Sequence, residues 1–314
     1  MKSERPVADR IVAHLGFAKA GSTAIRTWMD AAAQALGKRG WTVHAGTEAA
    51  RHAWTLSRIE RLDPAAAAFV GSLHSSASEK TSEVELEHLR DEMKESGRRK
   101  LLVSSEHLHL VRKPAETFAR FVGDGTKIDL LLCVRPRPEL INSLASELVY
   151  DLERDAETAE RDALAYDFSA TAVIDAWKDV PGTSLVIRDA RKGAVAALAE
   201  IVGDDAVGLV EEPIVNRKLP AAVAMALFEE KAKAQSLGEW KRLTRAVASS
   251  KMLVGFGDGP VVSEKTLQLA ARLESIDDFL ENGATALGTG RMDEAERRRA
   301  ANLVALTKRG LYEL

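Results

Sequence analysis

The stretch HLGFAKAGSTAIR, residues 14–26, joins the apolar run Ile11–Leu15 to a helical segment that begins at Ser22. Apolar residues on consecutive positions, rather than on alternate ones, are typical of a strand buried on both faces of a parallel sheet. Two glycines, Gly16 and Gly21, lie in the loop between the strand and the helix. This order of strand, glycine-containing loop and helix predicts the first unit of an α/β fold.

The alternation of strand and helix continues along the chain. Apolar runs at Lys100–Ser104, Ile128–Val134 and Ser184–Ile187 predict three more strands. Because strands joined by helices form parallel sheets, we expect an α/β fold with a central parallel sheet and helices on both faces. The helices are predicted at Ser22–Leu36, Glu83–Glu95, Pro114–Phe121, Pro138–Glu153, Ser169–Lys178 and Gly193–Ile201.

Strand signals fade beyond Pro213, and the remaining apolar patterns predict helices. We therefore expect an α/β core over residues 1–212 and a helical C-terminal extension over residues 213–314, packed together as one compact unit. The segment Trp41–Ser78 shows no clear pattern. The C-terminal helices are predicted at Ala221–Gln235, Glu239–Ser249, Glu264–Glu281 and Met292–Lys308.

Composition and charge disfavour several classes of protein. A formal net charge of −3 over 314 residues argues against a broad nucleic-acid-binding surface. The single cysteine, Cys133, lies in an apolar run and is predicted to be a small buried residue; it cannot form a disulfide within the chain or a Cys-based zinc site. No apolar run approaches the roughly 18 residues of a membrane span, and the polar start lacks a signal-peptide pattern, so we expect a cytoplasmic protein.

The loop at residues 16–23 has the features of a phosphate-binding cradle. The N–H groups at a helix start and the positive end of the helix dipole attract an anion, and glycine lets the backbone approach it closely. Ser22 and Thr23 add hydroxyl donors, and either can cap the helix. The ATP/GTP motif needs a lysine directly after its second glycine, whereas here Ser22 takes that position and Lys19 comes earlier. This displacement disfavours ordinary ATP or GTP hydrolysis.

The loop resembles the 5′-phosphosulfate loop of the sulfotransferase superfamily, which has a lysine two residues before Gly-(Ser/Thr)-(Ser/Thr). Many members have proline directly before the lysine, where this chain has Ala18. The resemblance implies a three-layer P-loop-like fold and 3′-phosphoadenosine 5′-phosphosulfate as co-substrate. It also implies that the donor is bound by Lys19, Ala20, Gly21, Ser22, Thr23 and Ala24.

Arg135 and Ser143 supply a second similarity to that superfamily. Arg135 follows the apolar run Ile128–Val134, and Ser143 comes eight positions later in the predicted helix. A planar guanidinium suits bidentate contacts with a phosphate, and a hydroxyl can complete the site. The pair is similar to the superfamily's 3′-phosphate motif, which implies that Arg135 and Ser143 bind the donor's 3′-phosphate.

The end of the predicted strand Lys100–Ser104 carries the candidates for a catalytic base. Transfer to an alcohol or amine needs a group that removes the acceptor proton, and glutamate and histidine are both suitable. The phrase Ser104-Ser105-Glu106 resembles bacterial sulfotransferases, so Glu106 is the preferred base and His107 the second choice. His109 is interpreted as packed in the core or exposed to solvent, and His14 as a core histidine.

The catalytic residues implied are therefore Lys19 with Glu106 or His107, and the acceptor is a hydroxyl or amine of a carbohydrate, a lipid headgroup or a small molecule. No metal is expected, because no convincing ligand cluster for one stands out. No nucleic acid partner is expected, because of the net charge of −3. Two other classes of function stay open: a P-loop kinase or NTPase, which the displaced lysine disfavours, and a catalytically inert nucleotide-binding module.

Overall fold

The chain divides into two compact units. The first consists of Met1–Arg135 and Asp167–Val215, and the second of Pro136–Tyr166 and Asn216–Leu314. The structure is a computed structural model. It describes residues 6–44, 53–55, 57, 62, 67, 70, 79–105, 107–111, 114–151, 156–166, 170–177, 180–206, 208–209, 223, 226–227, 242–243 and 246–247.

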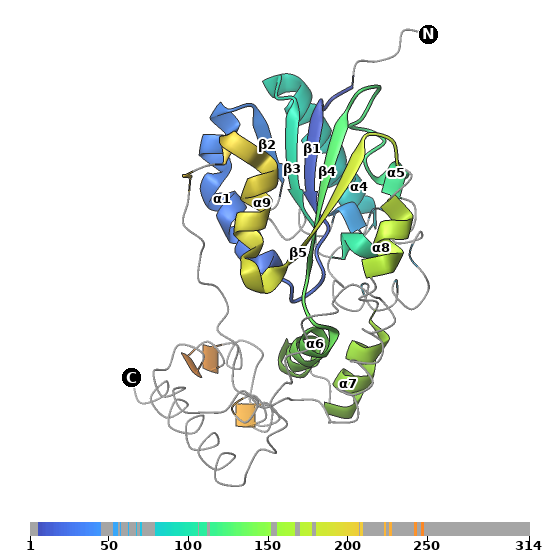
Figure 1. Cartoon of the computed structure of the whole chain (residues 1–314), viewed down its shortest axis with the longest axis vertical. Coiled ribbons are helices and arrows are strands. Elements are labelled where there is room, and N and C mark those ends of the chain that lie inside the picture. The colour runs from blue at the N-terminus through green and yellow to red at the C-terminus, as the bar shows by residue number, and fades with distance from the viewer. Residues whose placement is uncertain are drawn as a thin grey trace. The chain divides into compact units, whose positions relative to one another are not determined.

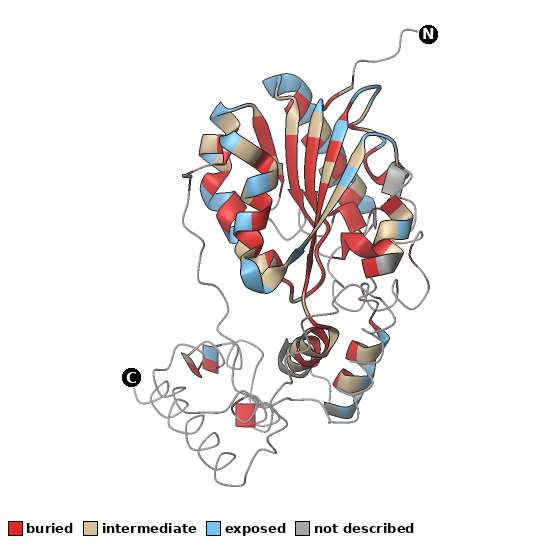
Figure 2. Ribbon diagram, viewed as in Figure 1, coloured by how far each residue is buried: buried red, intermediate tan, exposed pale blue. Residues whose placement is uncertain are grey.

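The first unit is built on a five-stranded parallel sheet with strand order β2-β3-β1-β4-β5 (Figure 1). The predicted α/β fold with a central parallel sheet is thereby confirmed. Side chains of the three central strands are almost entirely buried, as expected for strands covered on both faces (Figure 2). The strands are β1 (Arg10–His14), β2 (Trp41–His44), β3 (Lys100–Ser104), β4 (Lys127–Val134) and β5 (Thr183–Asp189).

Helices flank this sheet. α1 (Ser22–Lys38) and α9 (Ala194–Val202) pack side by side, and both contact the sheet. α4 (Glu79–Ser96), α5 (Pro114–Thr117) and α8 (Ala170–Trp177) lie on the other side of it in Figure 1. Short 3-10 turns occur at η2 (Leu108–Leu110), η3 (Ala190–Lys192) and η4 (Gly203–Asp205).

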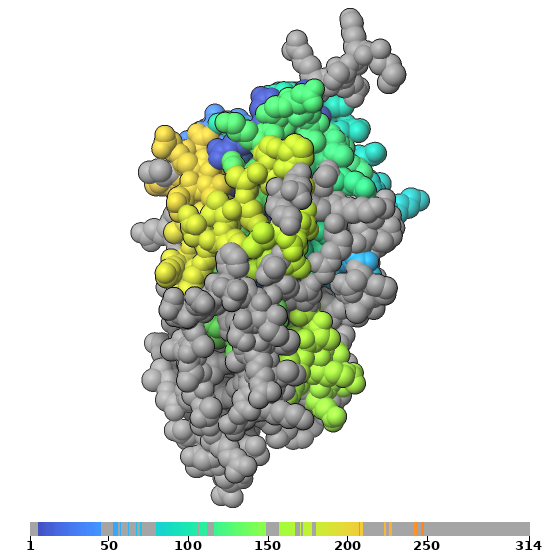
Figure 3. Space-filling view, turned by 45° about the vertical axis from the view of Figure 1, so that its right-hand side comes forward, coloured from blue at the N-terminus to red at the C-terminus, as the bar shows by residue number. Residues whose placement is uncertain are grey.

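The edge strand β5 differs from the central strands. Its side chains are half-buried or exposed along its whole length, although Leu185, Val186 and Ile187 are apolar. Atoms of this part of the chain reach the surface of the first unit in Figure 3. An edge strand has one neighbour instead of two, so partial exposure of this kind follows from its place in the sheet.

The second unit contains α6 (Arg137–Asp151) and α7 (Ala156–Ala165), which pack against each other. Of the predicted C-terminal helices, the structure describes seven residues, all helical: 223, 226, 227, 242, 243, 246 and 247. The predicted helices at Glu264–Glu281 and Met292–Lys308 lie outside the described residues. Within the described ranges, no helix has the length and apolarity needed to cross a membrane.

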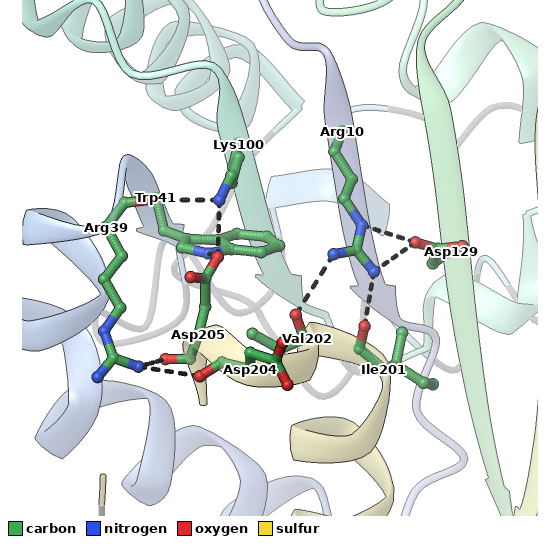
Figure 4. Close-up of polar contacts among 9 residues, drawn as sticks. All are labelled: Arg10, Arg39, Trp41, Lys100, Asp129, Ile201, Val202, Asp204 and Asp205. Atoms are coloured by element: carbon green, nitrogen blue, oxygen red, sulfur yellow. Dashed lines mark hydrogen bonds and ion pairs between the residues drawn. The ribbon is translucent and has the colours of Figure 1, made fainter. Parts of the chain in front are cut away.

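Basic side chains fasten the amino ends of the strands to the end of α9 (Figure 4). Arg10 at the start of β1 forms an ion pair with Asp129 at 2.8 Å. The same guanidinium donates hydrogen bonds to the carbonyl oxygens of Ile201 and Val202, at 2.6 and 3.3 Å. The last carbonyls of a helix lack partners in the helix and carry its negative dipole end, so a cation at this place stabilises the contact.

Asp205, in η4, is the second anchor of this network (Figure 4). Its carboxylate accepts hydrogen bonds from Trp41 Nε1 at 2.8 Å and from Lys100 Nζ at 2.6 Å. Arg39 donates to the carbonyl oxygens of Asp204 and Asp205. The hydrogen bond from Lys100, and then that from Trp41, hold the pKa of Asp205 below its ordinary value of 3.8. The starts of β2 and β3 are thus tied to the segment that follows α9.

We expect this carboxylate to make the stability of the protein depend on pH. Because the pKa of Asp205 is lowered by folding, its contribution is complete above the unfolded value of 3.8 and is lost as the pH falls through the lower folded value. Asp205→Asn should lower the free energy of unfolding by about 1 kcal/mol at neutral pH, and the difference from wild type should shrink on acidification below about pH 4. Urea unfolding at several pH values measures it.

The neighbouring Asp204→Asn is the matched control, because the Asp204 side chain is exposed. Its unfolding curve should stay close to that of wild type at every pH. A deficit of Asp205→Asn that does not change between neutral and acidic pH would contradict the assignment of the stabilising effect to the ionised carboxylate.

Candidate functional site

The candidate site lies where the chain connections diverge. The chain leaves β1 toward β2 on one side of the sheet and leaves β4 toward β5 on the other, while β1 and β4 are neighbours. In open parallel sheets, ligands bind beyond the carboxyl ends of the strands at such a switch point. Residues 15–21 follow β1 at this edge, and Arg135 follows β4. Both predicted halves of the donor site therefore start from adjacent strands.

The loop after β1 contains a tight turn centred on Lys19. The N–H of Ala20 donates to the carbonyl of Phe17 at 3.2 Å, which closes a four-residue turn. Lys19, at the third position of that turn, has a φ of 66°, a conformation that type II turns require there and that glycine usually supplies. A lysine in this region of backbone space is strained, and strain of this kind concentrates at functional sites.

Gly21 joins the loop to α1 and is required there on two counts. It is the N-cap residue of α1 and has a φ of 96°, which L-residues rarely adopt. A Cβ at this position would lie 2.6 Å from the Cβ of Ala194, in the first turn of α9. The absence of a side chain therefore lets α9 pack directly against the start of α1.

Ser22 and Thr23 begin α1, and neither caps it through its side chain. The buried Ser22 hydroxyl instead donates to the carbonyl of Phe17 at 3.4 Å, inside the loop. The bond from Ile25 N–H to Gly21 carbonyl, at 3.1 Å, starts the helix. The N–H groups before it belong to the helix start, where no helical acceptor exists, and such groups bind anions.

Arg135 contacts this loop directly. Its Nη1 donates a hydrogen bond to the carbonyl oxygen of Lys19 at 3.1 Å. A guanidinium has five N–H donors in a plane, so it can hold a backbone carbonyl and an anion at once. The structure thus brings together two of the residues selected from separate motifs, Lys19 and Arg135. Ser143 is half-buried on α6 in the second unit, so its pairing with Arg135 stays a prediction.

Polar groups gather at the end of β3. Ser104 Oγ lies 3.0 Å from Nδ1 of the fully buried His14, which confirms His14 as a hydrogen-bonded core histidine. Ser105 Oγ lies 3.4 Å from Thr55 Oγ1. His107 is buried, has a φ of 67° and precedes η2. Glu106, the preferred base, lies outside the described residues, so its role stays a prediction.

His109 holds the first part of the loop, a role that the sequence did not indicate. Its Nδ1 lies 2.6 Å from the carbonyl oxygen of Gly16, and its backbone N–H donates to the carbonyl of Leu15 at 3.2 Å. Its ring meets the Phe17 ring edge-on, with the centroids 4.6 Å apart. The buried environment agrees with the predicted core packing. The sequence does not predict these contacts with Leu15, Gly16 and Phe17, because no local pattern marks them.

His44, at the end of β2, is engaged through both ring nitrogens. Trp54 Nε1 donates to Nδ1 at 3.0 Å, so the proton of the neutral ring is on Nε2, which faces Glu85 at 3.3 Å. The hydrogen bond from His44 lowers the pKa of Glu85. Because neither nitrogen is left to accept a substrate proton, His44 serves to join α4 and Trp54 to the sheet.

Two further observations bear on chemistry at this edge. Cys133 is buried, as predicted, and burial raises the pKa of its thiol to about 12, which disfavours the reactive thiolate. Among the residues that the structure describes, no group of three or more His, Cys, Asp or Glu side chains is placed to hold a metal ion.

Comparisons with known proteins identify no relative of this chain. No protein-family model, no curated protein and no solved structure matches the chain. The fold itself is a parallel α/β sheet flanked by helices.

Proposed function

We propose that the protein is a sulfotransferase that moves a sulfuryl group from 3′-phosphoadenosine 5′-phosphosulfate to a hydroxyl or amine. The observation that carries the proposal is the hydrogen bond from Arg135 to the Lys19 carbonyl. It brings a cradle for one phosphate and a guanidinium suited to another within contact distance, at the switch point of the sheet. A donor with a separate 3′-phosphate and 5′-phosphosulfate matches that pair of anion sites.

The residues of the loop suit this donor. Gly21 has no Cβ, which lets α9 pack against the start of α1. Gly21 also has no side chain to cap α1, so the backbone N–H groups at the helix start suit the 5′-phosphate. Lys19 sits at the centre of the turn rather than after Gly21, which supports binding at a bridging oxygen rather than at a γ-phosphate. Arg135 would bind the 3′-phosphate, together with Ser143.

The proposed reaction is an in-line displacement at sulfur. The acceptor oxygen or nitrogen forms a bond to sulfur as the bond from sulfur to the 5′-phosphate oxygen breaks, and adenosine 3′,5′-bisphosphate leaves. Lys19 neutralises the charge that develops on that leaving oxygen, assisted by the N–H groups at the start of α1. Glu106 takes the acceptor proton, with His107 as the second choice. Placing the cation where charge develops is the largest contribution expected.

A titration with adenosine 3′,5′-bisphosphate in the absence of magnesium tests the donor assignment. We expect this ligand to bind and ATP to bind far more weakly, measured by calorimetry on the full chain. Tight binding of ATP that depends on magnesium would favour a kinase or NTPase. If adenosine 3′,5′-bisphosphate does not bind at millimolar concentration, the proposal is wrong.

Arg135→Ala separates the two contacts that we assign to this residue. Loss of a hydrogen-bonded phosphate contact should weaken adenosine 3′,5′-bisphosphate roughly 10- to 100-fold. Adenosine 5′-phosphate, which lacks the 3′-phosphate, should lose much less. An equal loss for both ligands would mean that Arg135 acts only through the Lys19 carbonyl, and would contradict its assignment to the 3′-phosphate.

A further inference from the structure

His109 contacts the loop after β1 and lies in the segment that follows the neighbouring strand, β3. It belongs to η2, three residues after Glu106 and five after the end of β3. A carbonyl oxygen can only accept a hydrogen bond, so the 2.6 Å contact with Gly16 means that His109 carries its proton on Nδ1 and donates it. The residue is 2% exposed, so this bond is shielded from competing water.

The two hydrogen bonds from His109 go to successive carbonyls, those of Leu15 and Gly16. In an extended strand, successive carbonyls point in opposite directions, so one residue cannot donate hydrogen bonds to both of them. Gly16, with a φ of 60°, turns the chain so that both carbonyls face η2. His109 therefore fixes the point at which the chain leaves β1 and enters the turn that carries Lys19.

The orientation of the next peptide group follows from the same bond. In a trans peptide the carbonyl and the N–H point in opposite directions, and no peptide bond among the described residues is cis. Holding the Gly16 carbonyl on His109 therefore fixes the plane of the Gly16–Phe17 peptide. The Phe17 carbonyl, which follows directly, accepts the bonds from Ala20 and Ser22 that shape the turn.

We infer that His109 is a positioning residue that sets the geometry of the donor cradle and links it to the segment that carries the candidate bases. This inference rests on the proposed function. The short turn η2 directly follows residues 104–107, and its His109 contacts residues 15–17. A displacement of residues 104–107 would therefore also displace the entry of the loop. Loss of the Nδ1–H bond should release the loop entry without removing any group that contacts the donor.

Three substitutions isolate the hydrogen bond. His109→Asn places an amide N–H close to the position of Nδ1 and should keep affinity for adenosine 3′,5′-bisphosphate within about threefold of wild type. His109→Leu keeps an apolar side chain of moderate size without the donor, and should weaken binding roughly 10- to 100-fold, because the buried Gly16 carbonyl loses its partner and the loop entry is no longer fixed. His109→Gln places its amide near Nε2 and should resemble the leucine variant. If His109→Leu does not fold, His109→Gln takes its place in the comparison.

Thr126→Val is the control for a merely structural effect. Thr126 is also buried, and its hydroxyl donates to the Ala8 carbonyl at 2.8 Å, before the start of β1 and β4 rather than at their ends. Thr126→Val should lower the melting temperature of the protein and leave its affinity for adenosine 3′,5′-bisphosphate unchanged. Calorimetry and thermal unfolding are measured on all variants, well below their melting temperatures.

The outcomes separate the inference from the proposal it rests on. If wild type does not bind adenosine 3′,5′-bisphosphate, the proposed function fails. If wild type binds it and His109→Leu binds equally well, His109 is a core residue only and the inference is overturned. The same conclusion holds if His109→Asn fails as badly as His109→Leu, because the donated hydrogen bond would then not be the determinant.

Discussion

Replacing Gly21 with alanine is expected to destabilise the protein by about 2–4 kcal/mol and to abolish binding of adenosine 3′,5′-bisphosphate. The new methyl group would lie 2.6 Å from the Cβ of Ala194, closer than Cβ atoms approach in proteins, so α1 and α9 must separate. The backbone, with a φ of 96°, is also unfavourable for alanine. Because the N–H groups that would bind the phosphate begin at this residue, the shift is felt directly in the cradle. Urea unfolding and calorimetry measure the two effects.

Two controls separate steric overlap from backbone strain. Gly40 has a φ of 83°, and no atom beyond its two chain neighbours lies within 4 Å of the place that a Cβ would take, so Gly40→Ala carries only the backbone cost of about 1 kcal/mol. Adding Ala194→Gly to Gly21→Ala removes the atom that clashes and should recover a large part of the lost stability, as a double-mutant cycle would show. If the two substitutions are additive, the close approach of α9 is not the cause.

If the proposed function holds, replacing Lys19 with alanine should lower the rate of sulfuryl transfer by about 100-fold or more. Removal of one preorganised group that stabilises developing charge has an effect of this size. Binding of adenosine 3′,5′-bisphosphate should fall less than the rate, because the charge on the leaving oxygen develops fully only during the reaction. Transfer is measured by the mass gain of sulfate on a panel of alcohols, phenols, amines and sugars. An unchanged rate in Lys19→Ala would remove the lysine from the mechanism.

Lys19→Gly supplies the control for folding. With a φ of 66°, position 19 favours glycine over alanine, so Lys19→Gly should be more stable than Lys19→Ala by about 1 kcal/mol. Both variants lack the ammonium group and should be equally inactive. If the more stable variant regained activity, the loss in Lys19→Ala would be a consequence of misfolding rather than of the missing charge.

Much of the fold could be predicted because its strands are uniform in character. β1, β3 and β4 are runs of consecutive apolar residues, and the structure has them within one residue of their predicted bounds. β2 was not predicted, since its four residues include Thr42 and His44 and the pattern is too short to stand out. α5 ends at Thr117, earlier than predicted, because Phe118 and Phe121 turn into an aromatic cluster with Trp54 instead.

The candidate site could be predicted in part. Lys19 and Arg135 follow two strands that the sequence identifies, and the parallel topology brings the ends of those strands together. The steric requirement for glycine at position 21 could not be predicted, because Ala194 is 173 positions away in the sequence. Only the packing of α9 brings Ala194 next to Gly21. The role of His109 depends on a contact across 93 positions with a backbone carbonyl, which leaves no trace in the residue types.

The network of Arg10, Lys100, Trp41 and Asp205 has a consequence for redesign of the protein (Figure 4). It fastens the amino ends of the strands to the segment after α9, whereas the cradle, Arg135 and η2 all lie beyond the carboxyl ends. The anchoring contacts and the proposed donor site thus lie at opposite ends of the strands of one sheet. If the proposed function holds, substitutions in the loops at the carboxyl ends should alter the choice of acceptor without disturbing the anchoring contacts at the amino ends.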